Sequence, residues 1–182
     1  MGLVEEVAGL LPMGDVDQHA RVVLDEAGCP VDVQLRRKTD ATSMIEQAMI
    51  LANETVAQHV FSKEQPLVYR VHESPRPKSL ETLLPVLKEL GYPIDGLATG
   101  GPAAYQRILR AAEGRSDEAL VNNMVLRSME RARYSVDALG HFGLASKHYC
   151  HFTSPIRRYP DLMVHRLLKD PLAMEGQLEW LA

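Results

Sequence analysis

The chain has 182 residues, of which 46% are hydrophobic and 24% are charged, and its formal net charge is −4. These values are typical of a folded globular protein of one domain or a large part of one, and they argue against intrinsic disorder. Because the overall charge is negative, any contact with nucleic acid depends on a local basic patch.

The first predicted elements are a β-hairpin and a long helix. The segments 21–25 and 31–38 flank a turn that contains Gly28 and Pro30, and apolar residues alternate with polar ones in the second segment. Residues 40–62 have the periodicity of one long helix. Its expected buried stripe is Ile45, Ala48, Met49, Ala52 and Val56, and a neighbouring face carries Glu46, Ile50, Asn53 and Ala57.

The middle of the chain is predicted to alternate between helices, strands and loops. In chain order we expect a strand over 67–73, a helix over 80–90 capped by Ser79, a Gly/Pro-rich loop over 92–102, a short helix over about 103–112, a longer helix capped by Ser116, and an extended segment over 141–152. Four methionines at helical spacing are expected in the core: Met44, Met49, Met124 and Met129. The fold class is therefore α/β (mixed α+β), with helices packed on a small, mostly antiparallel sheet.

The cysteines, histidines and apolar runs set limits on metals and location. Cys29 and Cys150 are far apart and lack metal-type spacing, which predicts free thiols in a reducing cytoplasm. His148 and His151 lie three residues apart without the further Cys or His ligands of a zinc site. No apolar stretch approaches the ~20 residues needed to cross a bilayer. We therefore expect a cytoplasmic protein with no zinc site and no membrane contact.

Positive charge gathers in the stretch 151–166, HFTSPIRRYPDLMVHR. Ser154 followed by Pro155 is typical of a helix start, which would place Arg157 and Arg158 in the first turn. Positive side chains there oppose the helix dipole, so local stability gives no reason for them. Unpaired backbone N–H groups beside a guanidinium instead make a fitting site for a phosphate.

Alternatives stay open for these basic residues. Either Arg157 or Arg158 pairs with Asp161 in an exposed salt bridge, which accounts for one arginine and not for both. Pro160 is expected to interrupt the helix one turn in and to hold the arginines in a set direction. Another basic group either lines an RNA channel or forms a solvated face paired with Glu130; its members are Arg127, Arg131 and Arg133.

Long segments of the chain resemble one known family. HFGLASKHYCHFTSPIRRYPDLMVHRLLK at 141–169 resembles the end of the catalytic domain of the ribonuclease R and ribonuclease II (RNB-domain) exoribonucleases. Three upstream segments resemble the family in order and spacing: IEQAMILANETVAQHV at 45–60, YRVHESP at 69–75 and NNMVLRSMERARY at 122–134. The resemblance covers most of the chain.

The resemblance implies a processive, Mg²⁺-dependent 3′→5′ exoribonuclease that hydrolyses single-stranded RNA to nucleoside 5′-monophosphates. Two metal ions would steady the attacking and leaving oxygens. By its place in the motif, Arg157 would be the catalytic arginine that neutralises charge growing on the phosphate. The implied substrate-binding residues are Glu46, Asn53, Ser154, Arg158 and Tyr159. Ser154 is also the expected helix cap, while His72 and His141, at family motif positions, are expected to be structural.

The sequence departs from the family in its acidic residues. The family's metal-binding aspartate cluster has no counterpart, because the aspartates are scattered and Asp15 and Asp17 are the closest pair. Gln47 replaces the second acid of the family's IEE block. We therefore interpret residues 1–182 as a C-terminal portion of the RNB domain, without metal ligands or a complete second domain, and inactive alone. Its partners would be RNA, the N-terminal half of the catalytic domain and RNA-binding domains. The alternative is a catalytically inactive RNA-binding or structural fragment.

Overall fold

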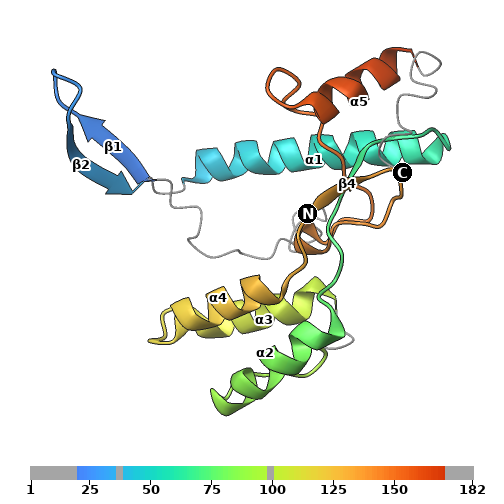
Figure 1. Cartoon of the computed structure of the whole chain (residues 1–182). Coiled ribbons are helices and arrows are strands. Elements are labelled where there is room, and N and C mark those ends of the chain that lie inside the picture. The colour runs from blue at the N-terminus through green and yellow to red at the C-terminus, as the bar shows by residue number, and fades with distance from the viewer. Residues whose placement is uncertain (1–19, 36–38, 98–100, 171–182) are drawn as a thin grey trace.

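The computed structural model describes residues 20–35, 39–97 and 101–170 (Figure 1). The elements in chain order are β1 (Ala20–Leu24), β2 (Pro30–Leu35), α1 (Asp40–Ser62), β3 (Tyr69–Val71), α2 (Pro77–Glu89), α3 (Pro102–Ala112), α4 (Glu118–Ser128), β4 (Arg133–Ser135), the 3₁₀ helix η2 (Phe142–Leu144) and α5 (Tyr159–Lys169). The mixed α/β class is confirmed. The described strands form two antiparallel pairs, β1–β2 and β3–β4, where one small sheet was expected.

The predicted hairpin is present as β1 and β2. Its turn forms because the Asp25 carboxylate accepts hydrogen bonds from the N–H groups of Ala27 (2.9 Å) and Cys29 (2.8 Å). Gly28 adopts a φ of +80° there, which a residue without a Cβ tolerates best. The hairpin projects beyond the start of α1 (Figure 1). Residues 36–38 of the expected second strand lie outside the described residues.

Helix α1 has the predicted length but packs through another face than expected. Thr39 and Thr42 form a reciprocal capping box at its start. The buried residues are Asn53, Ala57 and Val60, whereas Ile45 and Met49 of the predicted stripe are 56% and 42% exposed. The stripe lies mostly in the N-terminal half of α1, where periodicity is helical but the described chain supplies no packing partner. Met44 is exposed as well, and Met124 and Met129 lie at the edge of a core.

The described residues contain two hydrophobic cores. The first joins α2, α3 and α4 through residues such as Leu87, Tyr105 and Val121. The second joins the C-terminal half of α1 to β3, the segment around Cys150 and α5. The three helices of the first core are inserted between β3 and β4, which pair with Tyr69 opposite Ser135. Figure 1 shows this helical group below the level of α1 and α5.

Several predicted boundaries in the middle of the chain are wrong. Helix α2 begins at Pro77, ahead of the expected cap Ser79, because proline needs no N–H partner in a first turn. Asp117 rather than Ser116 precedes α4. The segment expected to be extended contains the helical turn η2, after which Ala145 has a φ of +51°. Within the expected loop over 92–102, residues 98–100 lie outside the described residues. No described helix is long and apolar enough to cross a membrane.

Candidate functional site

The loop before α5 forms one hydrogen-bonded turn at Ser154, but the helix does not begin there as the sequence predicts. Helix α5 begins at Tyr159, with Arg158 as its cap residue and Pro160 in its first turn. The Ser154 side chain is therefore not the helix cap; its carbonyl oxygen accepts bonds from the N–H groups of Arg157 (3.3 Å) and Arg158 (3.1 Å). A helix starting at Ser154 would place the Pro160 ring against the preceding turn. Pro160 consequently marks the start of the helix and does not interrupt it.

One of the two adjacent arginines, Arg158, forms an ion pair within the protein. Arg158 Nη2 lies 2.7 Å from Asp161 Oδ1, and the side chains are 25% and 0% exposed. The same carboxylate oxygen accepts a bond from the N–H of Ser154 at 2.7 Å. The salt bridge considered for Asp161 is thus present, but it is buried on the carboxylate side. This pair holds the loop against the first turn of α5.

The other arginine stays open to solvent. The side chain of Arg157 is exposed and forms no ion pair or hydrogen bond with any other residue in the described ranges. Its neighbour Ile156 is fully exposed, and Tyr159 is 55% exposed. The tip of the loop therefore presents one unpaired guanidinium beside an apolar and an aromatic side chain.

Asn53 of α1 lies beneath this loop. Its side chain is 3% exposed, and its Oδ1 accepts bonds from the N–H groups of Phe152 (3.0 Å) and Thr153 (3.2 Å). Its Nδ2 donates to the Tyr149 hydroxyl at 3.0 Å. Glu46, which is half-buried, precedes Asn53 by seven residues, or about 10 Å along the helix axis. The structure thus joins Asn53 directly to the loop 152–158, called the arginine loop below. Glu46 lies about two turns before Asn53 on the same helix.

Sequence reasoning missed three residues that shape this region. Asp161 was considered only as a surface partner, although its spacing from Arg158 was a usable signal. His165 bonds to the Phe152 carbonyl oxygen at 3.0 Å and stacks on the Phe152 ring at 4.2 Å. Tyr149 bonds to Asn53 from a position 96 residues away, and no local pattern predicts that contact.

A neutral histidine sits beside the loop. His151 Nδ1 lies 2.8 Å from the hydroxyl of Tyr134, and the guanidinium of Arg70 lies 4.8 Å from the centre of the Tyr134 ring. Burial, and after it the positive charge of Arg158, lowers the pKa of His151 to about 4. The ring is therefore uncharged near neutral pH and contributes no positive charge to an anion site.

The other basic residues do not form one helical face. Arg127 lies in the last turn of α4, whereas Arg133 lies in β4 and approaches Glu73 at 3.4 Å. Glu130 pairs with Arg76 at 2.7 Å, so the alternative in which Glu130 pairs with the neighbouring arginines is wrong. Helical spacing does not bring Glu130 next to these arginines, because α4 ends at Ser128.

The residues that the structure describes do not fit a magnesium site. They contain no group of three or more His, Cys, Asp or Glu side chains close enough to hold a metal ion. Asp15 and Asp17 lie outside the described residues. No catalytic step is therefore assigned to a metal held by this part of the chain.

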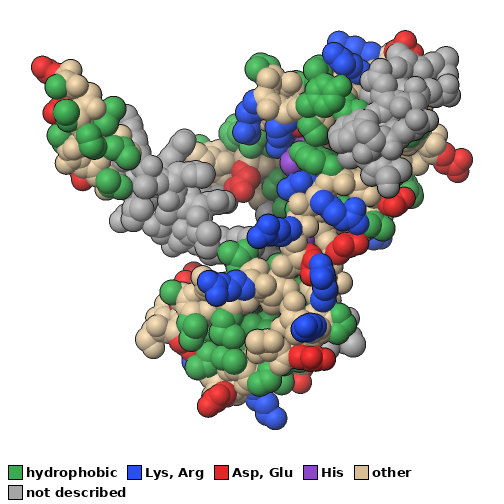
Figure 2. All heavy atoms as spheres, viewed as in Figure 1, with side chains coloured by type: hydrophobic (Ala, Val, Ile, Leu, Met, Phe, Trp, Pro, Cys, Tyr) green, Lys and Arg blue, Asp and Glu red, His purple; other side chains and the backbone are tan. Residues whose placement is uncertain are grey.

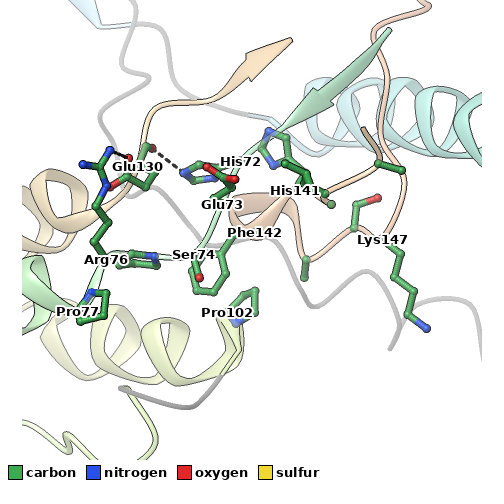
Figure 3. Close-up of a pocket in the computed structure, with 16 residues that line it drawn as sticks. His72, Glu73, Ser74, Arg76, Pro77, Pro102, Glu130, His141, Phe142 and Lys147 are labelled. Atoms are coloured by element: carbon green, nitrogen blue, oxygen red, sulfur yellow. Dashed lines mark hydrogen bonds and ion pairs between the residues drawn. The ribbon is translucent and has the colours of Figure 1, made fainter. Parts of the chain in front are cut away.

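A cavity of about 820 Å³ lies between the two cores, away from the predicted site residues (Figure 3). Its wall includes His72, Arg76, Glu130 and His141. Arg76 pairs with Glu130, and both His72 ring nitrogens are hydrogen-bonded, as a structural role requires. His141 Nδ1 is buried without a described partner. Burial, then the nearby His72, lowers the pKa of His141 to about 4.

Comparisons with known proteins agree on one family. The RNB domain matches residues 9–174. Ribonuclease R of Aquifex aeolicus is 47% identical over 166 residues, which are 90% of this chain and 24% of the relative. A structure of Mycoplasma genitalium RNase R in complex with double-stranded RNA matches with a TM-score of 0.83 and 33% identity, over 96% of this chain and 31% of the other. A structure of yeast Ssd1, described as a pseudonuclease, matches with a TM-score of 0.65 and 26% identity, over 73% of this chain and 17% of the other.

Proposed function

The chain belongs to the RNB domain family, and from that premise we propose that it supplies the phosphate-stabilising arginine of a ribonuclease R-type exoribonuclease. The reaction would be Mg²⁺-dependent hydrolysis of single-stranded RNA from its 3′ end to nucleoside 5′-monophosphates. The chain spans 24% of the length of the Aquifex aeolicus relative, so the proposed activity is that of a longer protein in which this segment would be one part. The observation that carries the proposal is the exposed guanidinium of Arg157, which has no ion-pair or hydrogen-bond partner among the described residues.

The contrast between the two adjacent arginines supports this role. Arg158 is bound to the fully buried carboxylate of Asp161, so it fixes the loop, and its Nη2 is already in use. Arg157 has no such partner within the described chain, and a guanidinium binds two phosphate oxygens at once through parallel N–H donors. A donor already in place when charge grows on the phosphate stabilises the transition state more than the bound substrate. Arg157 is therefore the catalytic member of the pair and Arg158 its support.

The remaining predicted residues take supporting positions. The half-exposed ring of Tyr159 offers a stacking surface for a base, which is the usual way proteins hold single-stranded nucleic acid. Glu46 faces the terminal nucleotide in this proposal, and Ser154 contributes through its backbone. Lys and Arg side chains also gather down the middle of the face in Figure 2, where a phosphate backbone would gain from them.

Metal binding is assigned to another part of the catalytic domain. Acidic residues supplied there would hold Mg²⁺, which would activate water and steady the leaving oxygen. This chain would contribute the phosphate contact and the RNA-facing surface. A cytoplasmic location remains part of the proposal, supported by the two cysteines, Cys29 and Cys150, which form no disulfide.

A non-catalytic role is the second candidate. The yeast Ssd1 structure shares this fold and is described as a pseudonuclease, so the fold alone does not decide activity. In that case the same surface would bind RNA without cutting it, and Arg157 would act only as a phosphate tether.

An activity test on a chimaeric protein distinguishes the catalytic from the non-catalytic candidate function. This chain replaces the aligned segment of Aquifex aeolicus ribonuclease R, which supplies the rest of the domain, and the unaltered relative serves as the positive control. We expect Mg²⁺-dependent release of nucleoside monophosphates from single-stranded RNA labelled at its 3′ end. A chimaera that unfolds cooperatively and binds RNA but releases no mononucleotide would overturn the enzymatic proposal in favour of the non-catalytic one.

A further inference from the structure

The arginine loop is held by side chains from two helices that are distant in sequence. Asn53 of α1 accepts the N–H groups of Phe152 and Thr153 through one oxygen. Asp161 of α5 accepts the next N–H along the chain, that of Ser154, at 2.7 Å. Three successive backbone donors are thus fixed by two side-chain oxygens, immediately before the turn that carries Arg157.

The second half of the loop is also held by a few hydrogen bonds. The Ser154 carbonyl oxygen accepts the N–H groups of Arg157 and Arg158. The Arg158 side chain returns to Asp161 at 2.7 Å, on the same oxygen that holds Ser154. His165, one turn after Asp161, bonds to the Phe152 carbonyl oxygen at 3.0 Å. A segment with no regular secondary structure therefore has a fixed backbone path.

Asn53 has little capacity left for a ligand. Its side chain is 3% exposed, and two N–H groups already use the lone pairs of Oδ1. Its Nδ2 donates to Tyr149, and its own carbonyl oxygen lies 3.4 Å from Cys150 Sγ. Any influence of Asn53 on bound RNA therefore passes through the groups that it binds, which are the loop and Tyr149.

We propose that Asn53 and Asp161 are positioning residues that clamp the loop 152–158 from two helices and thereby set the direction of the Arg157 guanidinium. The inference rests on the proposed function of Arg157, and it adds how that side chain is held. A neutral amide suits the buried position, because one oxygen binds two donors without burying a charge. Reaction rates are sensitive to such placement, since a shift of about 1 Å in a reacting group costs on the order of 10²-fold.

The clamp is tested first on this chain alone, without any assay of activity. Backbone amide exchange is measured by NMR in the wild type, in Asn53→Leu and in Gln58→Leu, a control at an exposed position of the same helix. We expect exchange at Phe152 and Thr153 to rise by about tenfold or more in Asn53→Leu, with little change elsewhere in α1. Unchanged exchange at these two amides would overturn the clamp. If Asn53→Leu does not fold, Asn53→Ala replaces it, because the smaller side chain leaves room for water.

The positioning role is tested second, by steady-state kinetics of the same variants in the chimaera. We expect Asn53→Leu to lower kcat by about tenfold or more while KM changes less than about threefold, and Gln58→Leu to change neither. A raised KM with unchanged kcat would mean that Asn53 contacts RNA and is not a positioning residue. Faster exchange with unchanged kcat would also overturn the proposal. An inactive wild-type chimaera would count against the proposed function, whereas the exchange measurement judges the clamp separately.

Discussion

The N–H of Gly143 donates a hydrogen bond to Nδ1 of His72 across 2.9 Å, so the proton of the neutral His72 ring lies on Nε2. That nitrogen donates to the Glu130 carbonyl oxygen at 2.8 Å. One imidazole therefore ties β3 both to the turn η2 and to the segment after α4. The helices α2, α3 and α4 are inserted between β3 and β4. This contact therefore fixes the point where the chain leaves α4 and returns to β4.

The first prediction follows from the closeness of Gly143 to this ring. A Cβ at position 143 would lie 2.8 Å from His72 Nδ1 and 3.1 Å from Cε1. The ring cannot withdraw without straining its bond to Glu130. We expect Gly143→Ala to lower the free energy of unfolding by about 1–3 kcal/mol, measured by urea denaturation. The control is the same substitution in a His72→Ala background, where the cost should largely vanish. An equal cost in both backgrounds would show that the ring is not the obstacle.

The sequence predicts elements better than it predicts contacts. Helix α1 and the hairpin were found from periodicity and turn chemistry, because both signals are local. The buried face of α1 was not found, since Ile45 and Met49 are as apolar as any core residue. Only the arrival of Tyr149 and Phe152, almost a hundred positions later, makes Asn53 a buried residue.

The candidate site shows the same limit. The cluster of charge around Arg157 and Arg158 was visible in the sequence, and so was the possible partner Asp161. Which arginine would be paired was not visible, because that choice depends on where α5 begins. Pro160 moved that start to Tyr159, and the capping serine expected at 154 became part of a turn.

The second prediction contrasts a buried ion pair with an exposed one. Asp161 is 0% exposed and holds both Arg158 and the N–H of Ser154. Removing the carboxylate leaves these donors without their partner, so Asp161→Ala should destabilise the fold by about 2–4 kcal/mol. The matched control is Glu73→Ala, whose partner Arg133 lies at 3.4 Å with both side chains about half exposed. That change should cost less than about 0.5 kcal/mol. Comparable losses of thermal stability for the two variants would contradict this reading.

The third prediction concerns pH and rests on two buried imidazoles. Burial is the main cause that lowers the pKa of both His141 and His151 from 6.5 to about 4. Between these values the unfolded chain binds protons that the folded chain does not, so stability is full above pH 6.5 and falls as the pH drops towards 4. We expect a loss on the order of 2 kcal/mol per imidazole after allowing for solvent screening, measured by chemical denaturation across this window.

A variant identifies the source of that pH dependence. His151→Gln keeps a polar side chain beside Tyr134 but removes the titrating ring. Its stability should change less steeply with pH than that of the wild type over the same window. Parallel curves for the two proteins would show that His151 does not contribute, and the loss would then come from His141 or from carboxylates elsewhere in the chain.

The last prediction concerns what the loss of the Arg157 guanidinium does to the stability and the activity of the chimaera. Arg157 is exposed and has no partner in the described residues, so Arg157→Ala should leave the free energy of unfolding within about 0.5 kcal/mol of the wild type. If its guanidinium meets the phosphate in the transition state, kcat should fall by on the order of 10²-fold or more while RNA affinity weakens little. Arg157→Lys should recover only part of that loss, because an ammonium lacks the planar pair of donors. Arg110→Ala, at an exposed position of α3, is the control for a lost positive charge. Equal losses in kcat/KM and in affinity for Arg157→Ala would instead make Arg157 a tether for the strand, as the non-catalytic candidate requires.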